Sequence, residues 1–173
     1  MTPMRCHPVQ RRSAGGFTLI ESVMSVLIIA VMYAAVLNTV GSSRQTQVAV
    51  TLNRKGHELA EHLMSEIMQQ PYWDPVLQAG MGPSSAEAAT GNRSLFNDVD
   101  DYNNWTKSPP QYKSGAAIPG FDGWERKVKI SWVQAANPQN TQGSESGIKR
   151  IEVTTSLNGK VYATLTTLRA NID

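Results

Sequence analysis

The sequence has a single cysteine, Cys6, and no proline between Pro8 and Pro71. One cysteine cannot form a disulfide within the chain. The absence of proline leaves a long stretch free to form one continuous helix. The sequence also has no Gly-x-Ser-x-Gly motif, no phosphate-binding glycine loop and only three histidines. We therefore find no plausible catalytic set and do not expect an enzyme.

Charged residues are almost absent from residues 17–40. Glu21 is the only Asp, Glu, Lys, Arg or His among these 24 residues. At about 1.5 Å per helical residue, the stretch is long enough to cross a bilayer core of about 30 Å. The sequence therefore predicts a transmembrane helix segment over residues 17–40.

Positive charge is concentrated before this segment. Residues 1–16 contain Arg5, Arg11 and Arg12 and no acidic residue, and without them the formal net charge changes from +2 to −1. The sequence pI near 8.8 thus reflects the leader, and we do not expect the rest of the chain to bind nucleic acid. The positive-inside rule places residues 1–16 in the cytoplasm and translocates the C-terminal part.

Glu21 needs a partner, because an unpaired carboxylate in hydrocarbon costs several kcal/mol. Cleavage after Gly16 would create an α-ammonium group on Phe17, one helical turn from Glu21. Glu21 would then be the fifth residue of the mature chain, and Cys6 would be lost with the leader.

The arginine-bearing leader, Gly16, Phe17, Glu21 and the long apolar segment together resemble the class III signal of type IV pilins and of the pseudopilins of type II secretion. The resemblance covers roughly residues 11–40. It implies that a membrane prepilin peptidase cuts after Gly16 and methylates the new amine. It also implies that Glu21 pairs with the amine of a neighbouring pilin-like subunit during filament assembly by inner-membrane machinery.

Other N-terminal signals explain these spacings less well. A plain signal anchor requires no glycine, aromatic residue and glutamate at fixed positions. A secretory signal peptide has an apolar core of about 7–15 residues, shorter than the segment here. A twin-arginine signal would place hydrophobic residues directly after Arg12, where the sequence has Ser13-Ala14-Gly15-Gly16.

An amphipathic pattern follows the apolar segment. Apolar residues recur at spacings near seven and four, and charged residues, including Glu58, Glu61 and Glu66, supply the polar side. The recurring apolar residues are Leu52, Leu59, Leu63 and Ile67. Residues 41–70 are therefore predicted to be a periplasmic amphipathic continuation of the same helix, ended by Pro71. Residues 59–67 also resemble the corresponding helix of minor pseudopilins of the I type.

Two histidines in this helix, His57 and His62, have a spacing close to that of a zinc protease motif. Five residues of helix separate their directions by about 140°, so they cannot share a zinc ion as histidines four residues apart can. We expect a solvated helix face with pairs among Glu58, His62 and Glu66.

The C-terminal part is predicted to be a sheet. Residues 71–123 have no sustained period but many aromatic residues, which predicts an ordered irregular region with short elements. Within residues 124–173, polar and apolar residues alternate, and Asn158-Gly159 predicts a two-residue hairpin turn. Three antiparallel strands are expected. The predicted fold class is α+β, with a long N-terminal transmembrane and amphipathic helix packed on a small antiparallel β-sheet, as in pilins.

Oxygen donors of the kind that Ca²⁺ prefers are concentrated at Asp98, Asp100 and Asp101. The segment is not an EF-hand, because the sixth position lacks glycine and the twelfth lacks glutamate. Certain pseudopilins bind calcium in a head-domain loop, so the resemblance makes calcium a candidate cofactor. Asx turns and a helix cap are the other interpretation of these residues.

These features predict a structural subunit, most like a minor pseudopilin of a type II secretion pseudopilus, in the inner membrane with a cytoplasmic leader and a periplasmic C-terminal domain. A minor pilin of a type IV pilus or DNA-uptake machine would have the same motif. A signal-anchored extracytoplasmic binding module is the alternative from another class. Its Asp- and Trp-rich region would hold calcium or a ligand, and its leader would stay uncleaved.

Overall fold

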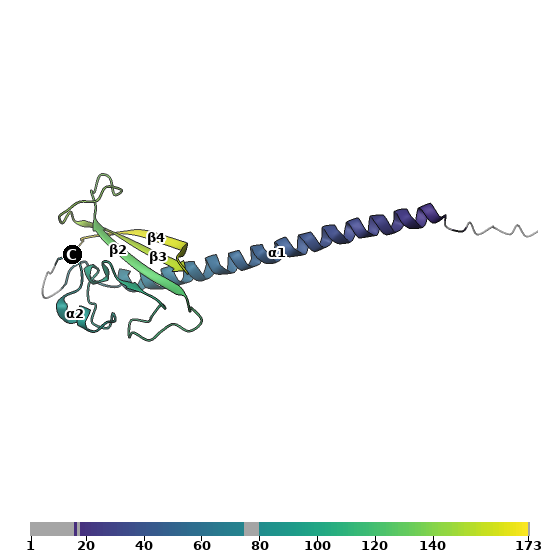
Figure 1. Ribbon diagram of the computed structural model, residues 1–173. Helices are drawn as coiled ribbons and strands as arrows, with labels where there is room; N and C mark the ends of the chain where they lie inside the picture. Colours follow the sequence, from purple (N-terminus) through teal and green to yellow (C-terminus); the bar gives the residue numbers. More distant parts are fainter. Residues whose placement is uncertain (1–15, 17, 75–79, 173) are drawn as a thin grey trace, which may run out of the picture. The chain divides into compact units, whose positions relative to one another are not determined.

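The computed structural model describes residue 16, residues 18–74 and residues 80–172. The chain divides into two compact units, Met1–Gln47 and Val48–Asp173, and helix α1 contributes to both. The elements in chain order (Figure 1) are α1 (Leu19–Met68), α2 (Ser85–Ala89), the 3-10 helix η1 (Asp100–Tyr102), β1 (Thr106–Lys107), β2 (Trp124–Trp132), β3 (Ile148–Leu157) and β4 (Lys160–Ala170). We call the second unit the head.

Helix α1 begins just after Thr18. The Thr18 hydroxyl accepts a hydrogen bond from the Glu21 backbone N–H at 3.3 Å, which satisfies one of the free donors at the helix start. The helix then runs for 50 residues to Met68. The single long helix expected from the sequence is confirmed, although it starts two residues later than Phe17, which lies outside the described residues.

The sheet has four antiparallel strands in the order β1-β2-β3-β4. In the central pairing Val128 lies opposite Val153, and the β3–β4 hairpin turns at Asn158 (φ 49°) and Gly159 (φ 82°). Positive φ at both residues is the geometry of the predicted turn. The expected number of strands was wrong, because β1 is a fourth. Its two residues are too few to produce a recognisable period.

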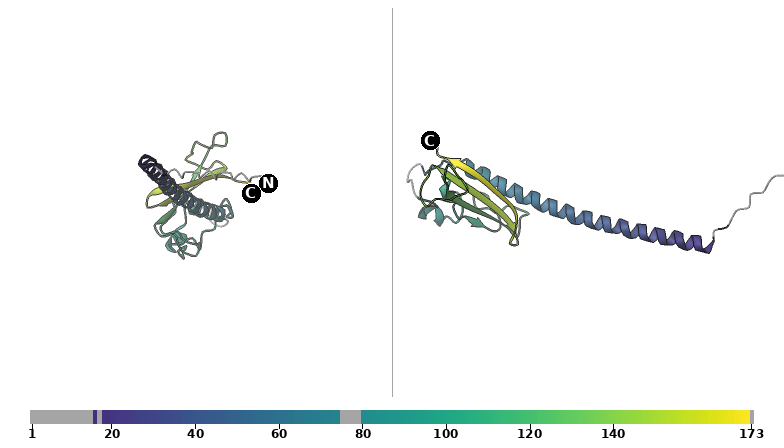
Figure 2. Two further views of the ribbon diagram at one scale, coloured as in Figure 1. Left: turned by 90° about the vertical axis from the view of Figure 1, so that its right-hand side faces the viewer. Right: turned by 90° about the horizontal axis from the view of Figure 1, so that it is seen from above.

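The core of the head lies between α1 and the inner face of the sheet (Figure 2). Apolar residues recur about every 3.6 residues in the helix and every second residue in the strands, so both elements place apolar side chains on this interface. The irregular region contributes Phe96, Val99 and Tyr102 to the same core, so this described part of it is ordered and packed. The buried residues of the helix are Ala60, Leu63 and Ile67, and those of the strands are Val128, Ile130, Ile151, Val153 and Ala163.

A glycine allows α1 to approach the sheet closely. The Thr155 hydroxyl donates to the Gly56 carbonyl at 3.0 Å, and a Cβ added at Gly56 would lie 2.8 Å from the Cβ of Tyr162. A side chain of any size would collide with the strand. This explains a glycine in a helix interior, where it is normally unfavourable.

Candidate functional site

The N-terminal part of α1 exposes its apolar side chains. Its large apolar residues are between 47% and 84% exposed, from Leu19 to Val40. Monomeric soluble proteins rarely expose so large an apolar surface. Within the described residues, α1 is the one helix that is long and apolar enough to cross a membrane. This segment therefore needs a membrane, other helices or both to cover it.

Glu21 lies in the first turn of α1 and is exposed. It is the only charged side chain of α1 before Arg44. A carboxylate is favourable at a helix N-terminus, where free N–H groups carry partial positive charge. Gly16 is also exposed and is not part of the helix. Phe17, the other residue of the expected processing site, lies outside the described residues.

Hydroxyl groups in this segment bond to the helix itself. The Ser25 hydroxyl donates to the Glu21 carbonyl at 2.8 Å, and the Thr39 hydroxyl donates to the Ala35 carbonyl at 3.0 Å. Such bonds satisfy polar groups without water, as a lipid environment requires. The carboxylate of Glu21 has no comparable arrangement among the described hydrogen bonds.

Near the C-terminal end of α1, inside the head, Glu66 is held by an ionic network. Both carboxylate oxygens of Glu66 accept from Arg93, at 2.8 and 3.0 Å, and Tyr102 donates its hydroxyl at 2.9 Å. Burial alone would raise the pKa of Glu66, but the hydrogen bonds and charge of Arg93 outweigh it and lower this pKa. The expected pairing of Glu66 with His62 is therefore wrong. Arg93 is distant in sequence, so helix spacing could not indicate it.

A second arginine, Arg126, lies beside this network. Arg93 and Arg126 are fully buried, and both donate through Nη2 to the carbonyl of Gln111. Their guanidinium carbons lie 4.2 and 5.8 Å from the Trp105 ring centroid. The sequence does contain a signal for Arg126, since it occupies an inward position of β2 between Trp124 and Val128. The inward position of Arg126 could not be recognised from the apolar residues of the strand alone, because an arginine is normally expected on the exposed face.

Lys149 ties β3 to η1 and to the segment that follows α1. Its Nζ donates to Asp100 at 2.7 Å and to the Tyr72 carbonyl at 2.6 Å, and lies 3.8 and 4.5 Å from the ring centroids of Tyr72 and Trp73. Burial raises the pKa of Asp100 even though Lys149 opposes the shift. This buried cation also follows the inward positions of its strand, and it too was missed.

The aspartates proposed for calcium are used within their own segment. Asp98 accepts from the Asp101 N–H at 3.1 Å, and Asp101 accepts from the N–H groups of Asn97 and Asp98 at 2.8 and 3.2 Å. Burial raises the pKa of Asp98 and of Asp101 to about 6. Asp100 pairs with Lys149 instead. In the part of the chain that the structure describes, no three acidic, histidine or cysteine residues are placed to hold a metal. Calcium stays a prediction that this geometry does not favour.

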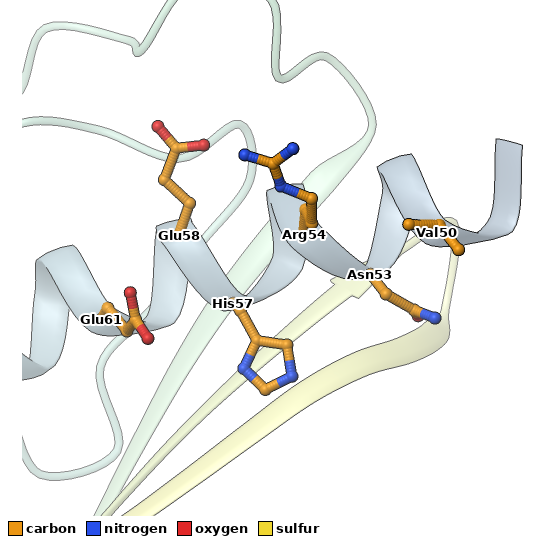
Figure 3. A pocket seen from close by; sticks show the side chains of 6 residues that line it. All are labelled: Val50, Asn53, Arg54, His57, Glu58 and Glu61. Carbon is orange, nitrogen blue, oxygen red and sulfur yellow. The ribbon is translucent and has the colours of Figure 1, made fainter. Parts of the chain in front are cut away.

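A shallow surface hollow follows the exposed side of α1 within the head (Figure 3). All of its lining residues belong to α1. The side chain of His57 points away from those of Glu58 and Arg54 (Figure 3). His62 instead packs edge-on against Tyr112, with ring centroids 6.4 Å apart. The two histidines thus have separate surroundings, as their spacing predicts. The lining residues are Val50, Asn53, Arg54, His57, Glu58 and Glu61.

Comparison of the chain with protein-family models, with curated proteins and with solved structures finds no match.

Proposed function

We propose that the protein is a pilin-like filament subunit, most like a minor pseudopilin of a type II secretion system. It would be inserted with its leader in the cytoplasm, cut after Gly16 by a prepilin peptidase and methylated on Phe17. Its N-terminal helix would then pack with those of other subunits into a short periplasmic filament.

The observation that carries this proposal is the place of Glu21. It lies in the first turn of a helix whose following side chains are apolar and exposed, and Gly16 precedes the helix at the spacing that a prepilin peptidase motif requires. A membrane anchor alone needs no carboxylate at this position. A helix that pairs with the α-amine of a neighbouring subunit does need a carboxylate here, because the positive charge of that amine would be costly if it stayed unpaired among packed helices.

The mechanism proposed for Glu21 is selection of register. A subunit that enters the filament with its carboxylate beside a neighbour's α-ammonium group neutralises both charges. A subunit displaced along the filament leaves both charges unpaired in a low-dielectric bundle. Only the aligned arrangement is retained, so the charge pair fixes the axial position of each new helix.

The same helix would serve a minor pilin of a type IV pilus or a DNA-uptake machine. Co-expression of the chain with the assembly components of each machine separates these candidates. Incorporation with type II secretion components, and with no others, supports the pseudopilin assignment.

The test of the mechanism is Glu21→Ala, with Glu21→Asp as the conservative control. Because processing would remove Cys6, a single Ala34→Cys substitution on the exposed helix surface, combined with one cysteine introduced into the N-terminal helix of the partner subunit, reports contact between the helices by oxidative disulfide cross-linking in membranes. We expect Glu21→Ala to be inserted and cleaved at near wild-type levels but to cross-link weakly to partner subunits, whereas Glu21→Asp keeps most of the cross-linking. Wild-type cross-linking of Glu21→Ala would show that Glu21 does not direct assembly.

A further inference from the structure

The buried ionic network of the head contains more positive than negative charge. Arg93 and Arg126 are fully buried, and among the described residues Glu66 is the one carboxylate that pairs with Arg93 and whose charge acts on Arg126. Glu66 uses both oxygens on Arg93, and Arg126 forms no ion pair among the described residues. Burial and the charge of Arg93 lower the pKa of Arg126 to about 10, so Arg126 is still charged at neutral pH. One positive charge is therefore uncompensated.

Several donors of these two groups also lack acceptors. Nε and Nη1 of Arg126 and Nη1 of Arg93 are buried and have no hydrogen-bond partner within the described residues. The two guanidinium groups are neighbours, because each donates to the carbonyl of Gln111 and each lies over the ring of Trp105. A buried charged donor without an acceptor is unfavourable, because its hydrogen bonds to water are lost on folding and no hydrogen bond within the protein replaces them.

We propose that the unpaired N–H groups of Arg93 and Arg126 bind a small monovalent anion of the chloride class. A single negative charge matches the single uncompensated positive charge. An anion also accepts hydrogen bonds from several N–H groups at once, which the donors require. Both arginines are fully buried, so a compact ion would need less rearrangement of the surrounding side chains than a large oxyanion.

The side chain of Gln111 fits this arrangement. Its Oε1 atom is buried without a hydrogen-bond donor among the described residues. A rotation by about 180° of the terminal amide group of a glutamine side chain exchanges the positions of its oxygen and its nitrogen. That turn would present the NH₂ group of Gln111 to the anion as a further donor. The site would then connect α1, through Glu66 and Arg93, to β2, through Arg126.

The direct test uses bromide as the probe in crystals of the full chain. An anomalous peak within hydrogen-bond distance of Arg126 Nε or Nη1 is expected. A water molecule, or the oxygen of Gln111, in that place would overturn the proposal, because neither neutralises the excess charge.

The second test measures thermal unfolding of the full chain in non-ionic detergent. Sodium chloride is exchanged for sodium gluconate at constant ionic strength, so that general screening by salt stays constant. We expect the Tm of the wild type to rise with chloride and then to saturate, as a bound ligand requires. Arg126→Met should lose this response. Lys127→Met, which removes an exposed cation from the opposite face of the same strand, should keep it. An equal response of all three proteins, or none in the wild type, would contradict the proposal.

Discussion

Gly56→Ala tests how closely α1 packs on the sheet. In an unhindered helix interior, alanine is more favourable than glycine by roughly 0.5–1 kcal/mol. Here the new methyl group would lie 2.8 Å from Tyr162 Cβ, 3.2 Å from Thr155 Oγ1 and 3.4 Å from Trp124 Cζ3. The nearest atom is next to the backbone of β4 and cannot turn away. Overpacking of this kind costs about 1–3 kcal/mol.

The net effect should be a loss of about 1–2 kcal/mol in the free energy of unfolding of the head, or a Tm lower by roughly 4–8 °C. The assay is tryptophan fluorescence during thermal unfolding in detergent, because all four tryptophans lie in the head. Gly41→Ala is the matched control, since no atom lies within 4 Å of a Cβ added at Gly41. That variant should leave the head transition unchanged. A Gly56→Ala head as stable as the wild type would refute the reasoning.

Two further substitutions test the buried charges of the head. Glu66→Gln removes the partner of the buried Arg93 and should destabilise the head by about 3–5 kcal/mol in urea unfolding, whereas the exposed Glu61→Gln should change stability by less than about 0.5 kcal/mol. Asp98 has a folded pKa of about 6, above its unfolded value, so its charge opposes folding increasingly as pH rises from about 4 to 7. Asp98→Asn, which keeps an acceptor for Asp101, should therefore gain stability relative to the wild type over that range, by up to about 3 kcal/mol. A stability difference that does not vary with pH would contradict this.

The parts of the fold that could be predicted are those with a local pattern. A long run without proline, apolar in its first half and amphipathic in its second, predicts α1. Alternation around an Asn158-Gly159 turn predicts β3 and β4. The processing motif around Gly16 and Glu21 is also local, which is why it could be located from sequence. Its function stays a prediction, because processing and pairing between subunits involve other proteins.

The parts that could not be predicted depend on contacts distant in sequence. Glu66 was placed on the polar side of the helix because an isolated helix gives no reason to bury it. Its partner Arg93 is brought to it by the irregular region, which has no period to place it. Strand β1 depends on its pairing of Thr106 with Lys127 rather than on its own composition. Pairings set by tertiary structure can override local preference.

The most direct test of the proposed function is the intact mass and N-terminal sequence of the membrane-extracted protein, expressed with and without a prepilin peptidase. We expect a chain that begins at Phe17 and is heavier by one methyl group, and we expect it only when the peptidase is present. A leader that remains attached in the presence of an active peptidase, or a cut after the apolar segment, would contradict a filament subunit and favour an anchored or secreted binding module.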